Sequence, residues 1–217
     1  MPLDNLPDLG RDFDQTLLLG FEEDPEQRER RSHVLDEKRL AKLAKWDKRY
    51  IGLAAHVASW SKDPSAQVGC VIFSPTYERA LTFSFNGFPA NVPDCDMILH
   101  DEDKTEKLAR IIHAEQNALI YAGREAKGCH AYVVGKPVCN ACAIMLIQAG
   151  IVRVVAPAPG MGKGVWDTRG RLALTLFKQA GVGFKPIDPD ESKKLIKKYG
   201  LRPKKTKETE PDDLDEC

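Results

Sequence analysis

The 217-residue chain lacks an excess of either charge, because 32 lysines and arginines balance 32 aspartates and glutamates. Proteins whose main task is to grip nucleic-acid phosphates carry a basic surplus, so we expect no nucleic-acid partner. The sequence also lacks an apolar run of the roughly 18 residues that a membrane helix needs, and we expect no membrane partner. Its first residues do not follow the basic-then-apolar pattern of an export signal, which favours a cytoplasmic location.

Aromatic residues are scarce, at 7% of the chain, and no segment interleaves them with basic residues as a single-strand stacking groove does. Internal repeats and low-complexity segments are absent as well. Hydrophobic residues make up 42%, which is enough for a sizeable core and excludes wholesale disorder. The composition therefore indicates a folded protein without the features of a strand-binding protein.

Three regions differ in their composition. Residues 1–45 are charged and interrupted by prolines, and we expect an N-terminal extension with at most a short helix around Glu26–Arg31. Residues 46–190 carry the apolar periodicity of one folded domain. Residues 191–217 predict a short helix, then a basic and finally an acidic stretch, which is typical of a solvated tail.

The apolar pattern predicts an α/β fold. Two strands of a hairpin pair antiparallel, whereas strands that alternate with helices pair in parallel. The sequence predicts a hairpin first and then an alternation of strands and helices. We expect a helix that starts at Asp36 or restarts at Asp47 and ends at Ser61–Pro64. The expected strands are Val68–Phe73, Ala80–Ser84, Tyr132–Val134, Ile151–Ala156 and Val182–Ile187. A loop is expected over Phe85–Asp103, and helices over His113–Ala122, Cys142–Ala149, Thr168–Ala180 and Asp190–Tyr199.

Two short motifs suggest a metal centre. His113-Ala114-Glu115 opens one predicted helix, and Pro137-Val138-Cys139-Asn140-Ala141-Cys142 leads into another. Catalytic zinc takes three protein ligands and keeps the fourth position for water, and His113, Cys139 and Cys142 supply three. A helix N-terminus also favours thiolate over thiol. Glu115 lies two residues after the histidine, where it can move protons without binding the metal.

Each motif has a simpler reading when it is taken alone. A single C-x-x-C motif is also typical of a redox pair or of half a structural zinc site, and H-x-E occurs by chance. Since the six cysteines occur without an export signal, metal binding or catalysis is favoured over disulfides. A closed structural zinc site would need a fourth ligand, and only Glu115 is available within the motifs.

The combination H-x-E…P-C-x-x-C is the known signature of zinc-dependent nucleobase deaminases. From about Trp46 to Ile187 the chain resembles the deoxycytidylate (dCMP) deaminase family of the cytidine deaminase superfamily. Four segments carry the resemblance, in the family's order: Ser-Lys-Asp-Pro-Ser-Ala-Gln-Val-Gly at 61–69, Phe-Asn-Gly-Phe-Pro at 85–89, His-Ala-Glu-Gln-Asn-Ala-Leu at 113–119 and Ile-Gln-Ala-Gly-Ile at 147–151. The resemblance implies a three-layer cytidine-deaminase-like fold with a five-stranded mixed sheet flanked by helices.

The implied activity is zinc-dependent hydrolytic deamination of dCMP to dUMP, which would supply dUMP for thymidylate synthesis. Hydroxide generated at the zinc attacks C4 of the cytosine, Glu115 shuttles the protons and ammonia leaves. The resemblance places the Ala114 backbone N–H at the ring carbonyl and Asn86 at the deoxyribose, although Asn86 before Gly87 also reads as a turn residue.

Lys62 and Arg110 are the candidate cations for binding the monophosphate. The simpler interpretation of Lys62 is a solvated lysine in a turn, and that of Arg110 is a solvated residue on a helix face. The resemblance further implies a homohexamer, activation by dCTP with Mg²⁺ and inhibition by dTTP. Some relatives hold a second, structural zinc near Cys95 and His100, which would need two further ligands.

The chain departs from the family pattern at three positions. Val138 separates Pro137 from the first ligand cysteine, Phe85 replaces the usual tyrosine, and Cys70 replaces alanine. Three alternative functions remain open. One is deamination of a 5-methyl or 5-hydroxymethyl dCMP. A tRNA adenosine deaminase is disfavoured by the zero net charge. A non-catalytic zinc-containing nucleotide sensor is disfavoured by Glu115, because a sensor needs no proton shuttle.

Overall fold

The computed structural model describes residues 25–93, 96–100 and 104–199. The chain divides into two compact units between Ala44 and Lys45. Helix α1 runs without a break over Pro25–Ala58. The helix in this region is therefore longer than the short one predicted around Glu26–Arg31. Pro25 suits the first helical position, where a missing N–H costs nothing.

Asp47 does not restart α1, because its carboxylate makes long-range contacts. It accepts hydrogen bonds from the Tyr132 hydroxyl at 2.9 Å and from Arg153 at 2.8 Å, and it pairs with Lys185. These partners lie on three different strands, so the carboxylate fixes α1 across the sheet. Burial opposes its charge, but these bonds outweigh burial and lower the pKa of Asp47 to about 2.

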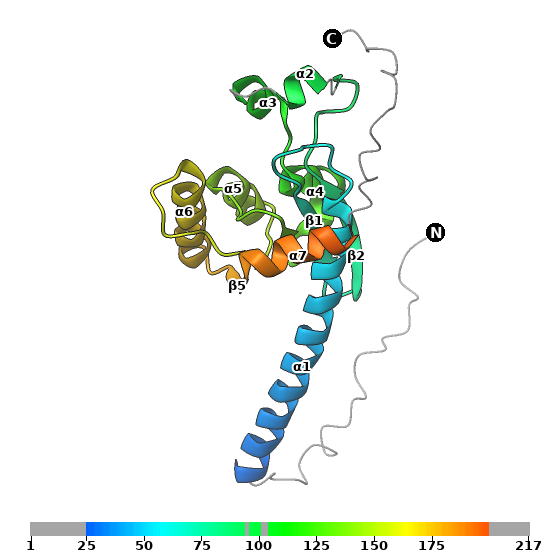
Figure 1. Ribbon diagram of the computed structural model, residues 1–217. Coiled ribbons are helices and arrows are strands. Elements are labelled where there is room, and N and C mark those ends of the chain that lie inside the picture. Colours follow the sequence, from blue (N-terminus) through cyan, green and yellow to red (C-terminus); the bar gives the residue numbers. More distant parts are fainter. Residues whose placement is uncertain (1–24, 94–95, 101–103, 200–217) are drawn as a thin grey trace, which may run out of the picture. The chain divides into compact units, whose positions relative to one another are not determined.

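Five strands form one mixed sheet in the order β2-β1-β3-β4-β5. Figure 1 labels β1, β2 and β5 of this sheet. β1 pairs antiparallel with β2 and β3, whereas β4 pairs parallel with β3 and β5. This confirms the predicted α/β class with an antiparallel hairpin followed by parallel strands. The strands are β1 Gly69–Ser74, β2 Arg79–Phe85, β3 His130–Val134, β4 Arg153–Pro157 and β5 Gly183–Ile187.

Helices cover both faces of the sheet, as the alternation of side chains on β1 shows. Cys70 and Ile72 pack into one hydrophobic cluster with residues of α4, α5 and α6, while Val71 and Phe73 pack into another with residues of α1. The covering helices on the first side are α4 Ala114–Ala122, α5 Asn140–Gln148 and α6 Val165–Gln179; α7 Pro189–Tyr199 packs with α1 on the second.

A close approach between α1 and β1 occurs at Gly69. A Cβ atom at this position would lie 2.1 Å from the backbone oxygen of Ala54, so only glycine fits. Within the described residues, no helix is long and apolar enough to cross a bilayer.

The segment between β2 and α4 contains two short helices that the sequence did not predict. α2 spans Asp96–Leu99, inside the expected loop Phe85–Asp103, and α3 spans Thr105–Arg110. Both are too short for apolar periodicity to be visible. α3 brings Lys107 into the interior, where its side chain is 2% exposed.

Candidate active site

Two helix N-termini meet at the motif residues. His113 is the N-cap of α4, and its backbone N–H donates to the Gln116 side-chain oxygen at 3.0 Å. Cys139 is the N-cap of α5, and its sulfur accepts the Cys142 backbone N–H at 3.5 Å. Both helices therefore begin where the sequence expected them to within two residues, and both aim their first turns at the same place.

The sulfurs of Cys139 and Cys142 lie 3.5 and 3.3 Å from His113 Nδ1. All three donor atoms fall within 4.8 Å of one another. Zinc bonds of about 2.3 Å to sulfur and about 2.0 Å to nitrogen, at tetrahedral angles, place such N and S atoms about 3.5 Å apart. The residues present therefore fit a zinc ion, and the observed N···S spacings are those that tetrahedral coordination requires.

The protonation of these groups also fits a cation. Hydrogen bonding from the Cys142 thiol, and then from His113, lowers the pKa of Cys139 to about 4. The thiolate of Cys139 in turn raises the pKa of Cys142 far above its usual range and raises that of His113. One thiol proton leaves easily and the second is retained because adjacent thiolates repel. A divalent cation removes that repulsion.

Glu115 lies beside this cluster in the first turn of α4 and is 3% exposed. Its burial raises the pKa of the carboxyl above the usual value, although the nearby His113 partly opposes the shift. The raised pKa favours proton uptake by this carboxyl, and a group that takes up and returns a proton is what acid–base catalysis needs.

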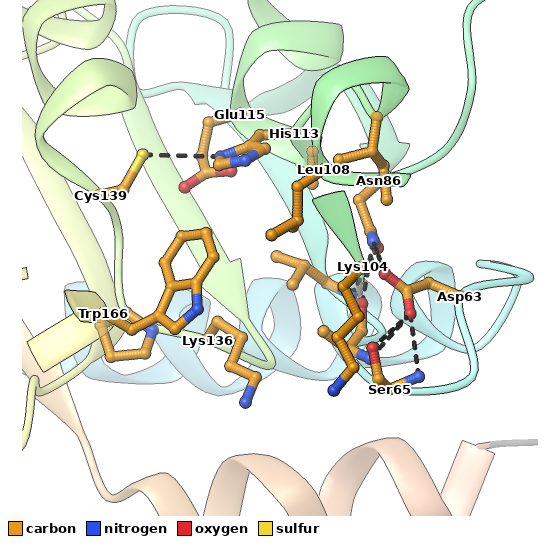
Figure 2. A pocket seen from close by; sticks show the side chains of 15 residues that line it. Asp63, Ser65, Asn86, Lys104, Leu108, His113, Glu115, Lys136, Cys139 and Trp166 are labelled. Atoms are coloured by element: carbon orange, nitrogen blue, oxygen red, sulfur yellow. Dashed lines mark hydrogen bonds between the residues drawn. The ribbon is translucent and has the colours of Figure 1, made fainter. Parts of the chain in front are cut away.

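A cavity of about 300 Å³ opens onto the cluster. Figure 2 shows His113, Glu115 and Cys139 at one side of it, with Lys104 and Lys136 on the side away from them. The indole of Trp166, 46% exposed, lies 6.2 Å from the His113 ring between centroids. The remaining lining residues are Asp63, Ser65, Ala66, Val68, Asn86, Leu108, Ile111, Ala114 and Pro137.

Asn86 lies in the cavity wall, but its amide also holds the wall together. Its oxygen accepts the Val68 backbone N–H at 2.8 Å, and its nitrogen donates to the Ala66 backbone oxygen at 2.9 Å. Ala114 lines the cavity as expected, and its own carbonyl accepts a hydrogen bond from the Ser84 hydroxyl at 2.8 Å.

The expected phosphate ligands lie elsewhere. Lys62 is exposed and outside the cavity lining, and so is Arg110, which pairs with Glu106 on its own helix. For the suggested second zinc, Cys95 lies outside the described residues and His100 is exposed. In the part of the chain that the structure describes, His113, Cys139 and Cys142 are the one cluster suited to a metal.

Several residues of the wall were not found from the sequence. Lys104, Lys136 and Trp166 gave no pattern, because single residues on loops and helix ends have no periodicity. The pair of Lys107 with Asp63, 3.2 Å apart, joins residues 44 positions apart in the chain. Lys107 also donates to the Ser65 hydroxyl at 2.7 Å, so α3 is tied to the loop before β1.

Comparison with known proteins agrees with this geometry. The sequence model of the cytidine and deoxycytidylate deaminase zinc-binding region matches residues 44–158. An uncharacterized deaminase of Aliivibrio fischeri is 39% identical over 64% of this chain and 92% of its own length. The deoxycytidylate deaminase of Mus musculus is 35% identical, over 70% of this chain and 84% of its own length.

Among solved structures, the dCMP deaminase of cyanophage S-TIM5 in complex with dCMP and dUMP shares the fold. It aligns with a TM-score of 0.52 and 21% identity, over 66% of this chain and 97% of that chain. The family match covers more than half of this chain, including all three metal-site residues. The chain therefore belongs to the cytidine and deoxycytidylate deaminases, a family of zinc-dependent hydrolytic enzymes.

Proposed function

We propose that this enzyme deaminates dCMP to dUMP with release of ammonia. The observation that carries the proposal is one cavity with a metal-binding cluster and a buried carboxyl at one side and two lysines at the other. The metal-binding cluster and the carboxyl suit the reaction on a pyrimidine base, and the two lysines suit the phosphate at the other end of the nucleotide. Curated relatives at 33–35% identity are named deoxycytidylate deaminases, which supports the same substrate.

His113, Cys139 and Cys142 would hold the zinc ion. Zinc bound by three such ligands lowers the pKa of a water molecule towards neutrality. Glu115 is placed to take one proton from the attacking water and deliver it to N3 of the base. It is then placed to carry the second proton from the former water oxygen to the C4 amino group, which leaves as ammonia. A shuttle of this kind contributes roughly 10²–10⁴ in rate.

Backbone and aromatic groups would orient the base. The Ala114 N–H belongs to the first turn of α4, where backbone donors lack a partner within the helix, and it is offered to the ring carbonyl. Trp166 lines the cavity, with its ring 6.2 Å from the His113 ring between centroids, and is assigned the stacking of the planar base. Asn86 lies where the deoxyribose would pass.

The 5′-phosphate is assigned to Lys104 and Lys136. These lysines line the cavity away from the metal cluster, whereas Lys62 and Arg110 do not line it. A phosphate between two ammonium groups gains charge-assisted hydrogen bonds, and a nucleoside without phosphate does not. Preference for the monophosphate over the nucleoside follows from this arrangement.

Five further properties belong to the same proposal. Supply of dUMP for thymidylate synthesis follows from the product. A homohexamer, activation by dCTP with Mg²⁺, inhibition by dTTP and a cytoplasmic location rest on the family resemblance. Light scattering tests the assembly, and initial rates with added dCTP or dTTP test the regulation. The outcome of either experiment leaves the catalytic assignment unchanged.

The test is a substrate panel of dCMP, 5-methyl-dCMP, 5-hydroxymethyl-dCMP, CMP and deoxycytidine, followed by ultraviolet absorbance. The Glu115→Gln variant should retain zinc and the fold but lose roughly 10²–10⁴ in kcat on dCMP. Glu125→Gln, which changes an exposed glutamate away from the cavity, is the matched control and should keep full activity. Absence of dCMP turnover by the zinc-loaded parent, or full activity of Glu115→Gln, would contradict the proposal.

Metal analysis tests the ligand set separately. Cys139→Ala removes one sulfur of the cluster and should lose bound zinc, whereas Cys129→Ala removes a buried cysteine outside the cluster and should keep it. Full zinc occupancy in Cys139→Ala would contradict the assignment of this residue.

A further inference from the structure

A second hollow, of about 510 Å³, adjoins the candidate active site. Ser65, Ala66 and Lys136 line both spaces, so the two share a wall beside the lysine side of the first cavity. The rest of its lining consists of Pro64, Gln67, Gly135, Lys193, Ile196 and Lys197. Nothing in the proposed deamination of a monophosphate uses this space.

The hollow is lined by charge of one sign. Lys136, Lys193 and Lys197 contribute three ammonium groups, and the described residues that line it include no carboxylate. The chain as a whole balances 32 basic with 32 acidic residues, so this segregation is local. Lys193 pairs with Asp190 at 3.1 Å, but both side chains are more than 60% exposed, and such a pair exchanges readily with another anion.

The position of the lysines is fixed by buried contacts. Ser192 is fully buried, and its hydroxyl accepts the Gly135 backbone N–H at 2.9 Å, which anchors α7 beside the loop that carries Lys136. Lys193 and Lys197 are four residues apart on α7, so they project from the same side of the helix. The fold therefore places all three lysines in the lining of one hollow.

We propose that this hollow is a polyphosphate subsite of the active site, which takes the terminal phosphates of a nucleoside diphosphate or triphosphate whose base lies in the first cavity. The inference rests on the proposed function, because the base and the first phosphate must occupy the cavity as described there. Lys136 then contacts the phosphate chain at the shared wall, and Lys193 and Lys197 contact its end.

Deoxyuridine nucleotides test the subsite without turnover. Calorimetric titration of the zinc-loaded enzyme compares dUMP, dUDP and inorganic tripolyphosphate at one low ionic strength, since exposed charges are screened by salt. The variant Lys193→Ala/Lys197→Ala removes two charges from the hollow. Lys194→Ala/Lys198→Ala is the matched control, because it removes two exposed charges from the same helix outside the hollow.

In the parent, dUDP should bind more tightly than dUMP. In Lys193→Ala/Lys197→Ala, the affinity for dUDP should fall about tenfold and that for dUMP by clearly less, which is what two exposed ion pairs can supply. The control variant Lys194→Ala/Lys198→Ala should keep the tighter binding of dUDP over dUMP. Equal losses in both double variants, or no advantage of dUDP in the parent, would overturn the subsite.

Failure of the proposed function gives a different result. If dUMP does not bind, but tripolyphosphate binds and loses affinity only in Lys193→Ala/Lys197→Ala, the subsite stands and the assignment of the nucleotide cavity is wrong. If dUMP binds, but the substitutions leave the affinities for dUDP and for tripolyphosphate unchanged, the cavity assignment stands and the subsite is wrong. A cytosine-containing single-stranded oligonucleotide that binds more tightly than dUDP would overturn the subsite in favour of a strand-binding surface.

Discussion

Replacement of Lys107 by methionine should destabilise the protein strongly. The ammonium lies 3.2 Å from Asp63, and the two side chains are 2% and 5% exposed. Methionine keeps most of the apolar stem but leaves the Asp63 carboxylate buried without its counter-ion. Loss of one partner of a buried pair costs about 3–5 kcal/mol. We expect the lower end because Ser65 and the Ala66 backbone N–H still donate to this carboxylate.

The stability lost in Lys107→Met should be larger at neutral pH than at acidic pH. Burial opposes the charge of Asp63, but bonds from Ser65 and from Lys107 outweigh it, so its pKa lies below the usual 3.8. A depressed pKa gives stability that is present above the unfolded value, near 4, and is lost as the pH falls through the folded value. Without the ammonium the pKa of Asp63 rises, so the deficit is largest at neutral pH and shrinks below about pH 4.

Urea unfolding at pH 7 and pH 4, at equal zinc content, measures this deficit. A loss of about 3 kcal/mol lowers the melting temperature by about 6–12 °C in a domain of this size. The double variant Lys107→Met/Asp63→Asn should recover part of the loss, because no buried charge remains. Lys178→Met, at an exposed position of α6, is the control. Less than 1 kcal/mol lost at pH 7, or additive single effects in the cycle, would refute the reasoning.

Three shorter predictions follow from other contacts. Gly69→Ala forces a Cβ to within 2.1 Å of the Ala54 carbonyl and should cost more than about 3 kcal/mol of unfolding free energy, measured by urea titration. Asp47→Asn should reduce the loss of stability that the parent shows between pH 4 and pH 2 by up to about 2 kcal/mol in urea unfolding, because the parent carboxyl has a pKa of about 2 and the amide does not titrate. Trp166→Ala should raise KM for dCMP about tenfold while zinc content stays unchanged, since the indole lines the cavity without contributing to the metal cluster; an unchanged KM would remove its stacking role.

The strands could be predicted because their signal is local. The five strands of the sheet coincide within three residues at each end with apolar runs that are bounded by turn residues. The metal cluster could be predicted because each motif opens a helix and the two motifs together form the known deaminase signature. The spacing within each motif is local, but the fold brings His113 to the two cysteines.

The lysine side of the cavity could not be predicted, because its residues meet only in the folded chain. Lys104 precedes a helix of six residues, and Lys136 follows β3, so neither stands in a pattern. Lys62 and Arg110 were chosen for being near the motifs in sequence, but sequence proximity does not fix the direction of a side chain. The sequence left open whether α1 is one helix or restarts at Asp47, because this aspartate has the residue type of a helix cap but serves as a partner of Arg153.

The cavity wall explains why the site depends on interactions far from the chemistry. The loop between α1 and β1 has few apolar side chains, so hydrogen bonds from Asn86 and the pair of Lys107 with Asp63 hold its shape. Such a wall can present polar groups to a nucleotide, which an apolar wall cannot do. Its geometry is then set by long-range partners, one directly after β2 and one on α3. Substrate orientation and the packing of the sheet are therefore coupled through the same few side chains, and substitutions there should change stability and KM together.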